Sequence, residues 1–166
     1  MTAFHNLSRE QRHRAADRLT DLWQLEERLA WQLDAWMLRH ARALPHYDAA
    51  AAADLRRRSA RVRRALKQAI LGLGRPTLRL PVVLNRVDEQ GATRMLQRIY
   101  SDNRAALQQA RLATLHADAT ADHEAALVFE ELTTCLTARR EFLRSLSAPV
   151  HTLASQASTH YQPTAA

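Results

Sequence analysis

The chain has 166 residues and a net charge of +7, with 46% apolar and 25% charged residues, which excludes a disordered polymer and allows one domain with a hydrophobic core. The single cysteine excludes an intramolecular disulfide framework, and no apolar run reaches the ~20 residues of a membrane span. Three glycines and five prolines make turns rare, so the abundant alanine, leucine and arginine predict long helices.

The first predicted helix extends to about residue 43. Ser8 and Gln11 have the spacing of a capping box at its start, and Pro45 follows its end. Apolar residues recur every seven positions, with others at a four-residue offset, as expected for one buried face. This face comprises Ala15, Leu19, Leu22, Leu29, Leu33, Trp36 and Ala43, and two polar residues, Glu26 and His40, interrupt it.

The second predicted helix, from about residue 48 to residue 73, is strongly basic. Seven basic side chains against Asp48 and Asp54 give it a net charge of +5. Gly72, Gly74 and Pro76 are typical of a helix end. Its apolar face comprises Leu55, Val62, Leu66, Ile70 and Leu73.

Pro81 opens a predicted short helix that ends near residue 89. Two long helices follow, one from about residue 92 to 117 and one from an N-cap at Asp118 or Thr120 to about residue 147. Residues 1–147 form the predicted bundle domain, and residues 148–166 a flexible tail rich in Ser, Thr, Ala and Pro. The inward faces comprise Leu96, Ile99, Ala106, Ala110 and Ala113, then Ala121, Ala125, Val128, Leu132, Cys135, Phe142 and Leu146.

The connection lengths predict the topology. The first and last pairs of helices are joined by a few residues each, so each pair forms an antiparallel hairpin. The middle connection of about 17 residues reaches about 55 Å, whereas a 26-residue helix is about 39 Å long. The sequence therefore predicts an all-α four-helix bundle, ferritin-like, with one long crossover that carries a short helix.

Four residues are candidate metal ligands, because carboxylates and imidazoles suit iron and zinc: Glu26, His40, His46 and Asp48. Glu26 and His40 lie fourteen residues apart, about 21 Å along one helix, and cannot share an ion within one chain. The alternative roles are structural. Glu26 would pair with an arginine or lie at an end of the bundle, and the histidines would be exposed near the first turn.

Two further features of the sequence suggest interactions. Arg57, Arg61 and Arg64 share one stripe with Lys67 nearby, and such groups bind phosphates, so this stripe is the candidate nucleic-acid-binding surface. The alternative is an ordinary solvated face. Cys135 lies on an apolar stripe and is interpreted as a core residue rather than a nucleophile.

Several stretches resemble the Dps mini-ferritins, over about residues 15–147. They are Ile70-Leu-Gly-Leu-Gly-Arg-Pro76, Arg94-Met-Leu-Gln-Arg-Ile-Tyr-Ser-Asp-Asn103, the acidic start of the last helix from Asp118, and its end, Arg139-Arg-Glu-Phe-Leu-Arg-Ser-Leu146. The resemblance implies a homo-oligomer, a dodecamer in that family, that handles iron or protects DNA under stress.

The ligands of the family's iron-oxidising centre are largely missing here. Trp36 matches the Tyr-His-Trp motif of the first helix, but no histidine precedes it. His46 and Asp48 lie near the second histidine position, whereas residues 50–53 and 62–66, where carboxylates are expected, are alanine, aliphatic or basic. The resemblance therefore implies an atypical or lost ferroxidase centre, with iron as the implied cofactor.

Three functions follow from these observations. The first is a Dps-like oligomeric stress protein. The second is a non-catalytic helical module that binds a protein partner, which the missing ligands favour. The third is a nucleic-acid-binding protein that uses the arginine-rich face. Residues 1–14 lack the apolar region of a signal peptide, so we expect a cytoplasmic location and no membrane partner.

Overall fold

The protein is a bundle of four helices. The computed structural model describes residues 8–41, 47–74, 91–119 and 122–158, with side chains as far as residue 147. These segments contain helices and no strand, as the all-α prediction requires, and no helix in them is long and apolar enough to cross a membrane. The helices are α1 (Arg9–His40), α2 (Ala49–Gly72), α3 (Ala92–Ala119) and α4 (His123–Ser158).

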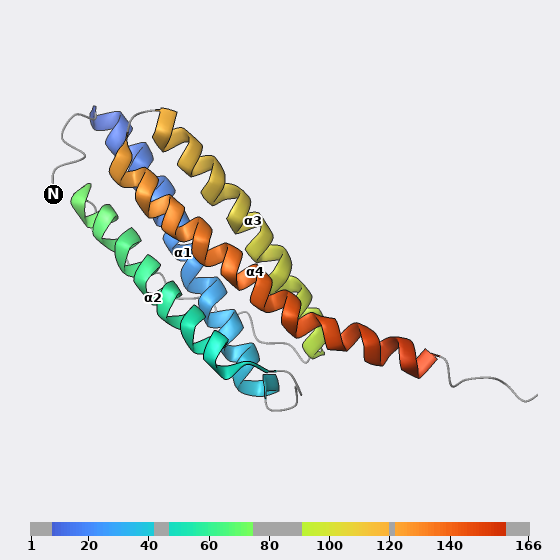
Figure 1. Ribbon diagram of the computed structural model, residues 1–166. Coiled ribbons are helices and arrows are strands. Elements are labelled where there is room, and N and C mark those ends of the chain that lie inside the picture. The colour runs from blue at the N-terminus through green and yellow to red at the C-terminus, as the bar shows by residue number, and fades with distance from the viewer. Residues whose placement is uncertain (1–7, 42–46, 75–90, 120–121, 159–166) are drawn as a thin grey trace, which may run out of the picture.

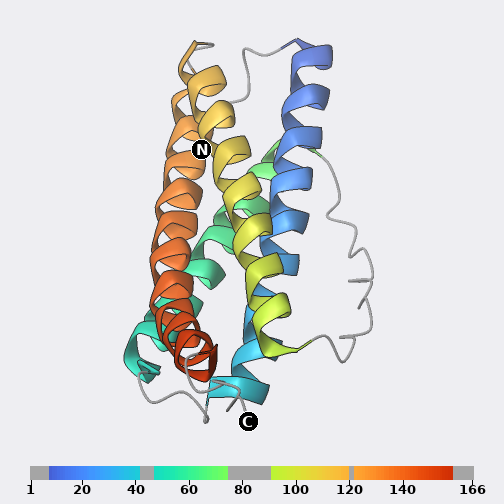
Figure 2. The same cartoon turned by 90° about the vertical axis from the view of Figure 1, so that its right-hand side faces the viewer.

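The four helices lie at the corners of a square, and the ends that α2 and α3 present to their connection lie at opposite ends of the bundle. Helix α1 packs against α2 and α3, and α4 packs against the same two helices, so α1 and α4 face each other along a diagonal. Helices α2 and α3 run in the same direction, whereas α1 and α4 run oppositely to them (Figures 1 and 2). Gly74 and Gly91 therefore lie at opposite ends of the bundle, which confirms the predicted long crossover. The short helix predicted from Pro81 to residue 89 lies outside the described residues.

Local chemistry fixes several helix ends, and those at Ser8 and Gly74 were predicted. The Ser8 hydroxyl accepts from the Gln11 amide and the Gln11 side chain accepts from the Ser8 amide, which completes the capping box of α1. Asp48 caps α2 by accepting from the amide of Ala51 at 2.9 Å. Gly74 follows α2 with a φ of +78°, the left-handed conformation that favours glycine.

Both ends of α4 differ from the prediction. Asp118 belongs to the last turn of α3, and Asp122 caps α4 instead by accepting from the amide of Ala125 at 3.1 Å. The other predicted cap, Thr120, lies outside the described residues. The predicted end near residue 147 is wrong, because α4 continues to Ser158 and projects beyond the other helices (Figure 1). A proline such as Pro149 removes one backbone hydrogen bond but need not end a helix.

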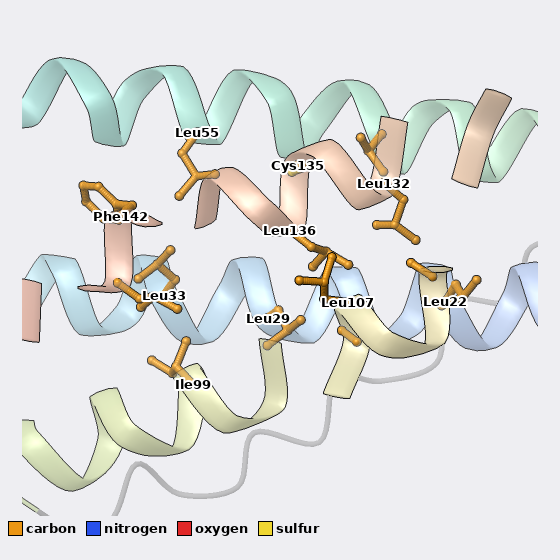
Figure 3. Packing of buried hydrophobic residues seen from close by; sticks show 14 of the residues in the cluster. Leu22, Leu29, Leu33, Leu55, Ile99, Leu107, Leu132, Cys135, Leu136 and Phe142 are labelled. Atoms are coloured by element: carbon orange, nitrogen blue, oxygen red, sulfur yellow. The ribbon is translucent and has the colours of Figure 1, made fainter. Parts of the chain in front are cut away.

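The core runs along the bundle axis. Leucines and isoleucines from all four helices interdigitate there, as Figure 3 shows for Leu29 of α1, Leu55 of α2, Ile99 of α3 and Leu136 of α4. Most residues of the predicted apolar faces are buried in this cluster. Four members of those faces are only half-buried: Ala15, Leu73, Ala113 and Val128. Two others, Ala43 and Ala121, lie outside the described residues.

Candidate functional site: a buried polar layer and a basic outer face

Each helix contributes one buried polar residue to the middle of the core. Among the described residues these are Glu26 of α1, Ser59 of α2, Asn103 of α3 and Arg139 of α4, each at most 3% exposed. The side chains of Glu26, Ser59 and Arg139 are in direct contact. Asn103 donates from Nδ2 to the carbonyl of Leu136, one turn before Arg139, at 3.0 Å. The four residues thus form a polar layer across the bundle.

The polar layer lies on the same stripes that build the core. Ser59 lies four residues after Leu55 and three before Val62 on the buried face of α2. Arg139 likewise stands between Cys135 and Phe142 on the buried face of α4. A position on an apolar stripe points inward whatever its residue type, since helical periodicity alone sets its direction.

The ion pair between Glu26 and Arg139 is bidentate. Arg139 donates from Nη1 to Oε2 of Glu26 at 2.7 Å and from Nη2 to Oε1 at 2.6 Å. The Ser59 hydroxyl donates to Oε1 of Glu26 at 2.6 Å and lies 3.4 Å from Nη2 of Arg139. Burial alone would lower the pKa of Arg139, but the charge and hydrogen bonds of Glu26 outweigh it, so this pKa lies above its ordinary value.

The structure describes three of the four predicted metal ligands, Glu26, His40 and Asp48. Glu26 is engaged by Arg139 and Ser59, the arginine pairing that the sequence left open. His40 is half-buried with its ring 5.4 Å from that of Trp36, Asp48 caps α2, and His46 lies outside the described residues. Within the described segments no three His, Cys, Asp or Glu side chains gather closely enough to hold a metal ion.

Cys135 lies beside the polar layer and is 1% exposed. Burial raises the pKa of its thiol to about 11, and the negative charge of Glu26 contributes in the same direction. A thiol of this kind stays protonated at neutral pH and is a poor nucleophile. Cys135 is therefore a core residue, as predicted.

The predicted phosphate-binding residues form one exposed surface on α2, here called the basic face: Arg57, Arg61, Arg64 and Lys67. Their spacing places them on the side of α2 that points away from the core. Within the described segments, Arg61, Arg64 and Lys67 form no ion pair, whereas Arg57 lies 3.5 Å from Asp54.

The arginines on the other sides of α2 have acidic partners. Arg56 pairs with Asp34 of α1 at 2.7 Å, and Arg63 pairs with Glu27 of α1 at 3.1 Å. Arg58 binds Asp54 on its own helix at 2.6 Å, and this contact lowers the pKa of Asp54. The uncompensated charge of α2 is thus concentrated on the basic face.

Three members of the polar layer were not identified from the sequence: Ser59, Asn103 and Arg139. Each interrupts a stripe of apolar residues, as Glu26 does in α1, so the gaps in the stripes were the available signal.

No family model, no curated protein and no solved structure matches this chain. The resemblance to the mini-ferritins therefore stays a hypothesis.

Proposed function

We propose that the protein is a non-catalytic helical bundle that binds nucleic acid through the basic face. The observation that carries the proposal is the difference between the sides of α2. Arginines directed toward α1, such as Arg56 and Arg63, are neutralised by carboxylates, whereas Arg61, Arg64 and Lys67 form no ion pair with any other described residue. Exposed guanidinium groups without a protein partner are suited to phosphate.

The dimensions of the basic face agree with a phosphate backbone. Arg57 and Lys67 are ten residues apart, which corresponds to about 15 Å along the helix. Duplex DNA carries about nine charges over about 15 Å of its axis. Over this length the duplex therefore carries about twice as many charges as the basic face has basic side chains. Contacts of this kind bind without reading the base sequence.

The polar layer supports the non-catalytic part of the proposal. Both carboxylate oxygens of Glu26 accept hydrogen bonds from Arg139, and one also accepts from Ser59. Glu26 could bind a metal only by giving up these contacts and leaving a buried guanidinium without a partner, which is costly.

The test is a binding titration of labelled duplex DNA, single-stranded DNA and RNA by fluorescence anisotropy over a salt series. We expect affinity to fall steeply with salt, because each phosphate contact contributes about −0.9 to the logarithmic slope for duplex DNA. The variant Arg57→Gln/Arg64→Gln/Lys67→Gln removes three of the four charges. It should reduce the size of that slope by about 2.7.

A matched control removes three exposed arginines from α3 with the same change in net charge: Arg94→Gln/Arg98→Gln/Arg104→Gln. This variant should keep most of the affinity and slope. Equal losses in both variants would show that binding follows net charge and not the basic face. Absence of binding at about 50 mM salt would contradict the proposal outright.

A second candidate is a ferritin-like oligomer that handles iron, and the observation that favours it is the parallel run of α2 and α3 with a long crossover between them (Figure 2). It requires a large assembly, a dodecamer in the mini-ferritins, and ligands supplied between subunits. Light scattering and an assay of ferrous iron oxidation, with His40→Ala and Asp48→Ala as variants, test it. A protein that stays small and leaves the oxidation rate at the buffer value would remove this candidate.

A further inference from the structure

A groove of about 690 Å³ runs between α2 and α4 on the surface of the bundle. Its floor is apolar and includes Val62, Val128 and the edge of Cys135. Leu127 borders the groove with 62% of its surface exposed, and it is one of only five large apolar side chains exposed among the described residues. Leu127 thus continues the apolar floor of the groove onto the surface of the bundle.

The two sides of the groove carry opposite charges. Arg58 and Arg61 line it from α2, and Glu124, Glu130 and Glu131 line it from α4. They do not neutralise one another across the groove. Arg58 is bound to Asp54 of its own helix, and within the described segments neither Arg61 nor the three glutamates take part in an ion pair. The surface thus presents a positive and a negative strip that run side by side.

We infer that this groove is the contact surface between two copies of the chain, related by a two-fold axis parallel to the helices. Helices α2 and α4 are antiparallel neighbours, so this rotation places α2 of one copy over α4 of the other. It also preserves the level along the axis, so that Arg61 of each copy meets Glu130 and Glu131 of the second copy. A two-fold axis across the helices would instead stack α2 on α2, with like charges opposed.

The size of the surface agrees with a dimer. Helix α2 has 24 residues, about 36 Å, and two adjacent helices are together about 20 Å wide, so the face covers about 700 Å². A standard interface buries about 800 Å² on each partner. In such a contact Leu127 is enclosed against α2 of the second copy, which removes the exposed apolar surface from water.

Light scattering and sedimentation of the full chain test the dimer. We expect a mass of twice 18.8 kDa at micromolar concentration. Leu127→Lys places an ammonium opposite Arg58 and Arg61 of the second copy and should yield a monomer with unchanged helicity. Its control, Leu112→Lys on the outer face of α3, changes a leucine that is 60% exposed, adds the same charge, and should leave the dimer intact.

Charge reversal tests the orientation. Arg61→Glu should weaken the dimer by about tenfold or more, because it opposes like charges. Adding Glu130→Arg/Glu131→Arg to it should restore the dimer. A monomeric wild type, an assembly unaffected by Leu127→Lys, equal disruption by Leu112→Lys, or a charge reversal without rescue would each overturn the inference.

Arg61 belongs to both surfaces, and in the dimer it is engaged by the second copy, so the two proposals are separated with variants that leave Arg61 unchanged. Arg57→Gln/Arg64→Gln/Lys67→Gln leaves the groove intact and should remain dimeric, while Leu127→Lys should still bind nucleic acid at low salt. Failure of one proposal therefore leaves the other standing.

Discussion

The guanidinium of Arg139 and the carboxylate of Glu26 form two hydrogen bonds, of 2.6 and 2.7 Å, between helices that do not pack against each other directly. Helices α1 and α4 lie on a diagonal, so only long side chains join them across the core. Both partners are 1% exposed. A buried pair contributes little net stability compared with apolar residues, but it penalises every packing that separates the two charges. We interpret the pair as the contact that fixes the register of α1 relative to α4.

If the pair fixes the register, loss of Arg139 alone should destabilise the fold far more than loss of both partners. Arg139→Met should lower the free energy of unfolding by about 3 to 5 kcal/mol, because it leaves the Glu26 carboxylate buried without its partner. Adding Glu26→Leu should recover most of the loss, since two apolar side chains remove the unpaired charge. Urea denaturation followed by far-UV circular dichroism measures both effects.

The control for this pair is Arg111→Met on the exposed face of α3, which should change the free energy of unfolding by less than about 0.5 kcal/mol. A double-mutant cycle of Arg139→Met and Glu26→Leu measures the coupling energy between the two residues. If the two losses simply add, the residues are not energetically coupled, and the pair does not fix the register of the helices.

The raised pKa of Cys135 predicts how the stability of the fold changes at alkaline pH. Its pKa rises from an ordinary value of 9.0 to about 11 in the folded chain, so the unfolded chain loses this proton first as pH increases. The protonated thiol thus favours the folded state below pH 9, and this contribution is lost as pH rises toward 11. The total loss is about 2 to 3 kcal/mol.

Cys135→Ala isolates that contribution from other groups that titrate at high pH. The unfolding free energy of the wild type minus that of Cys135→Ala should be constant up to about pH 8. Above that pH the difference should fall, because only the wild type loses the contribution of the protonated thiol. Labelling of the thiol by a disulfide reagent should also be far slower in the native than in the denatured chain. Rapid native labelling at neutral pH would mean that Cys135 is accessible and the pH argument fails.

Two substitutions of Asp48 distinguish a capping role of this residue from a metal-binding role. Its carboxylate accepts from the amide of Ala51 at 2.9 Å, and asparagine caps helices about as well as aspartate. Asp48→Ala should cost about 1 kcal/mol, whereas Asp48→Asn should be nearly neutral. The measurement is thermal unfolding with and without added ferrous or zinc ions. A stabilisation by metal that Asp48→Asn abolishes would assign Asp48 to a metal site instead.

Local chemistry explains why some features were predictable. The cap at Ser8 and the turn at Gly74 depend on nearby residues alone, and both are present as predicted. The exposure of Arg57 and its neighbours on the basic face follows from helical periodicity. The fold class and the crossover follow from helix and connection lengths.

Contacts between distant residues were not predictable in the same way. Periodicity placed Glu26 on a buried stripe, but its partner lies 113 residues away and depends on which helices form the diagonal. Periodicity likewise places Arg139, and not the adjacent Arg140, on the buried stripe of α4, but it does not show that Arg139 meets Glu26. The predicted end of α4 was also wrong: the Ser, Thr, Ala and Pro content beyond residue 147 is typical of a flexible tail, yet α4 continues to Ser158.

Trp36 links the end of α1 to the start of α3. Its indole Nε1 donates to the carbonyl of Ala92 at 2.9 Å, and its ring is 2% exposed. Trp36→Phe keeps an aromatic ring but removes this hydrogen bond and part of the packing, so it should cost about 1 to 2 kcal/mol. Trp23→Phe, at a half-buried position where the indole forms no such hydrogen bond with another described residue, should cost less. Because the lost contact anchors the first turn of α3, amide hydrogen exchange near Leu96 should accelerate in Trp36→Phe more than in the centre of the helix. Uniform acceleration along α3 would instead indicate a global loss of stability and no local anchoring by Trp36.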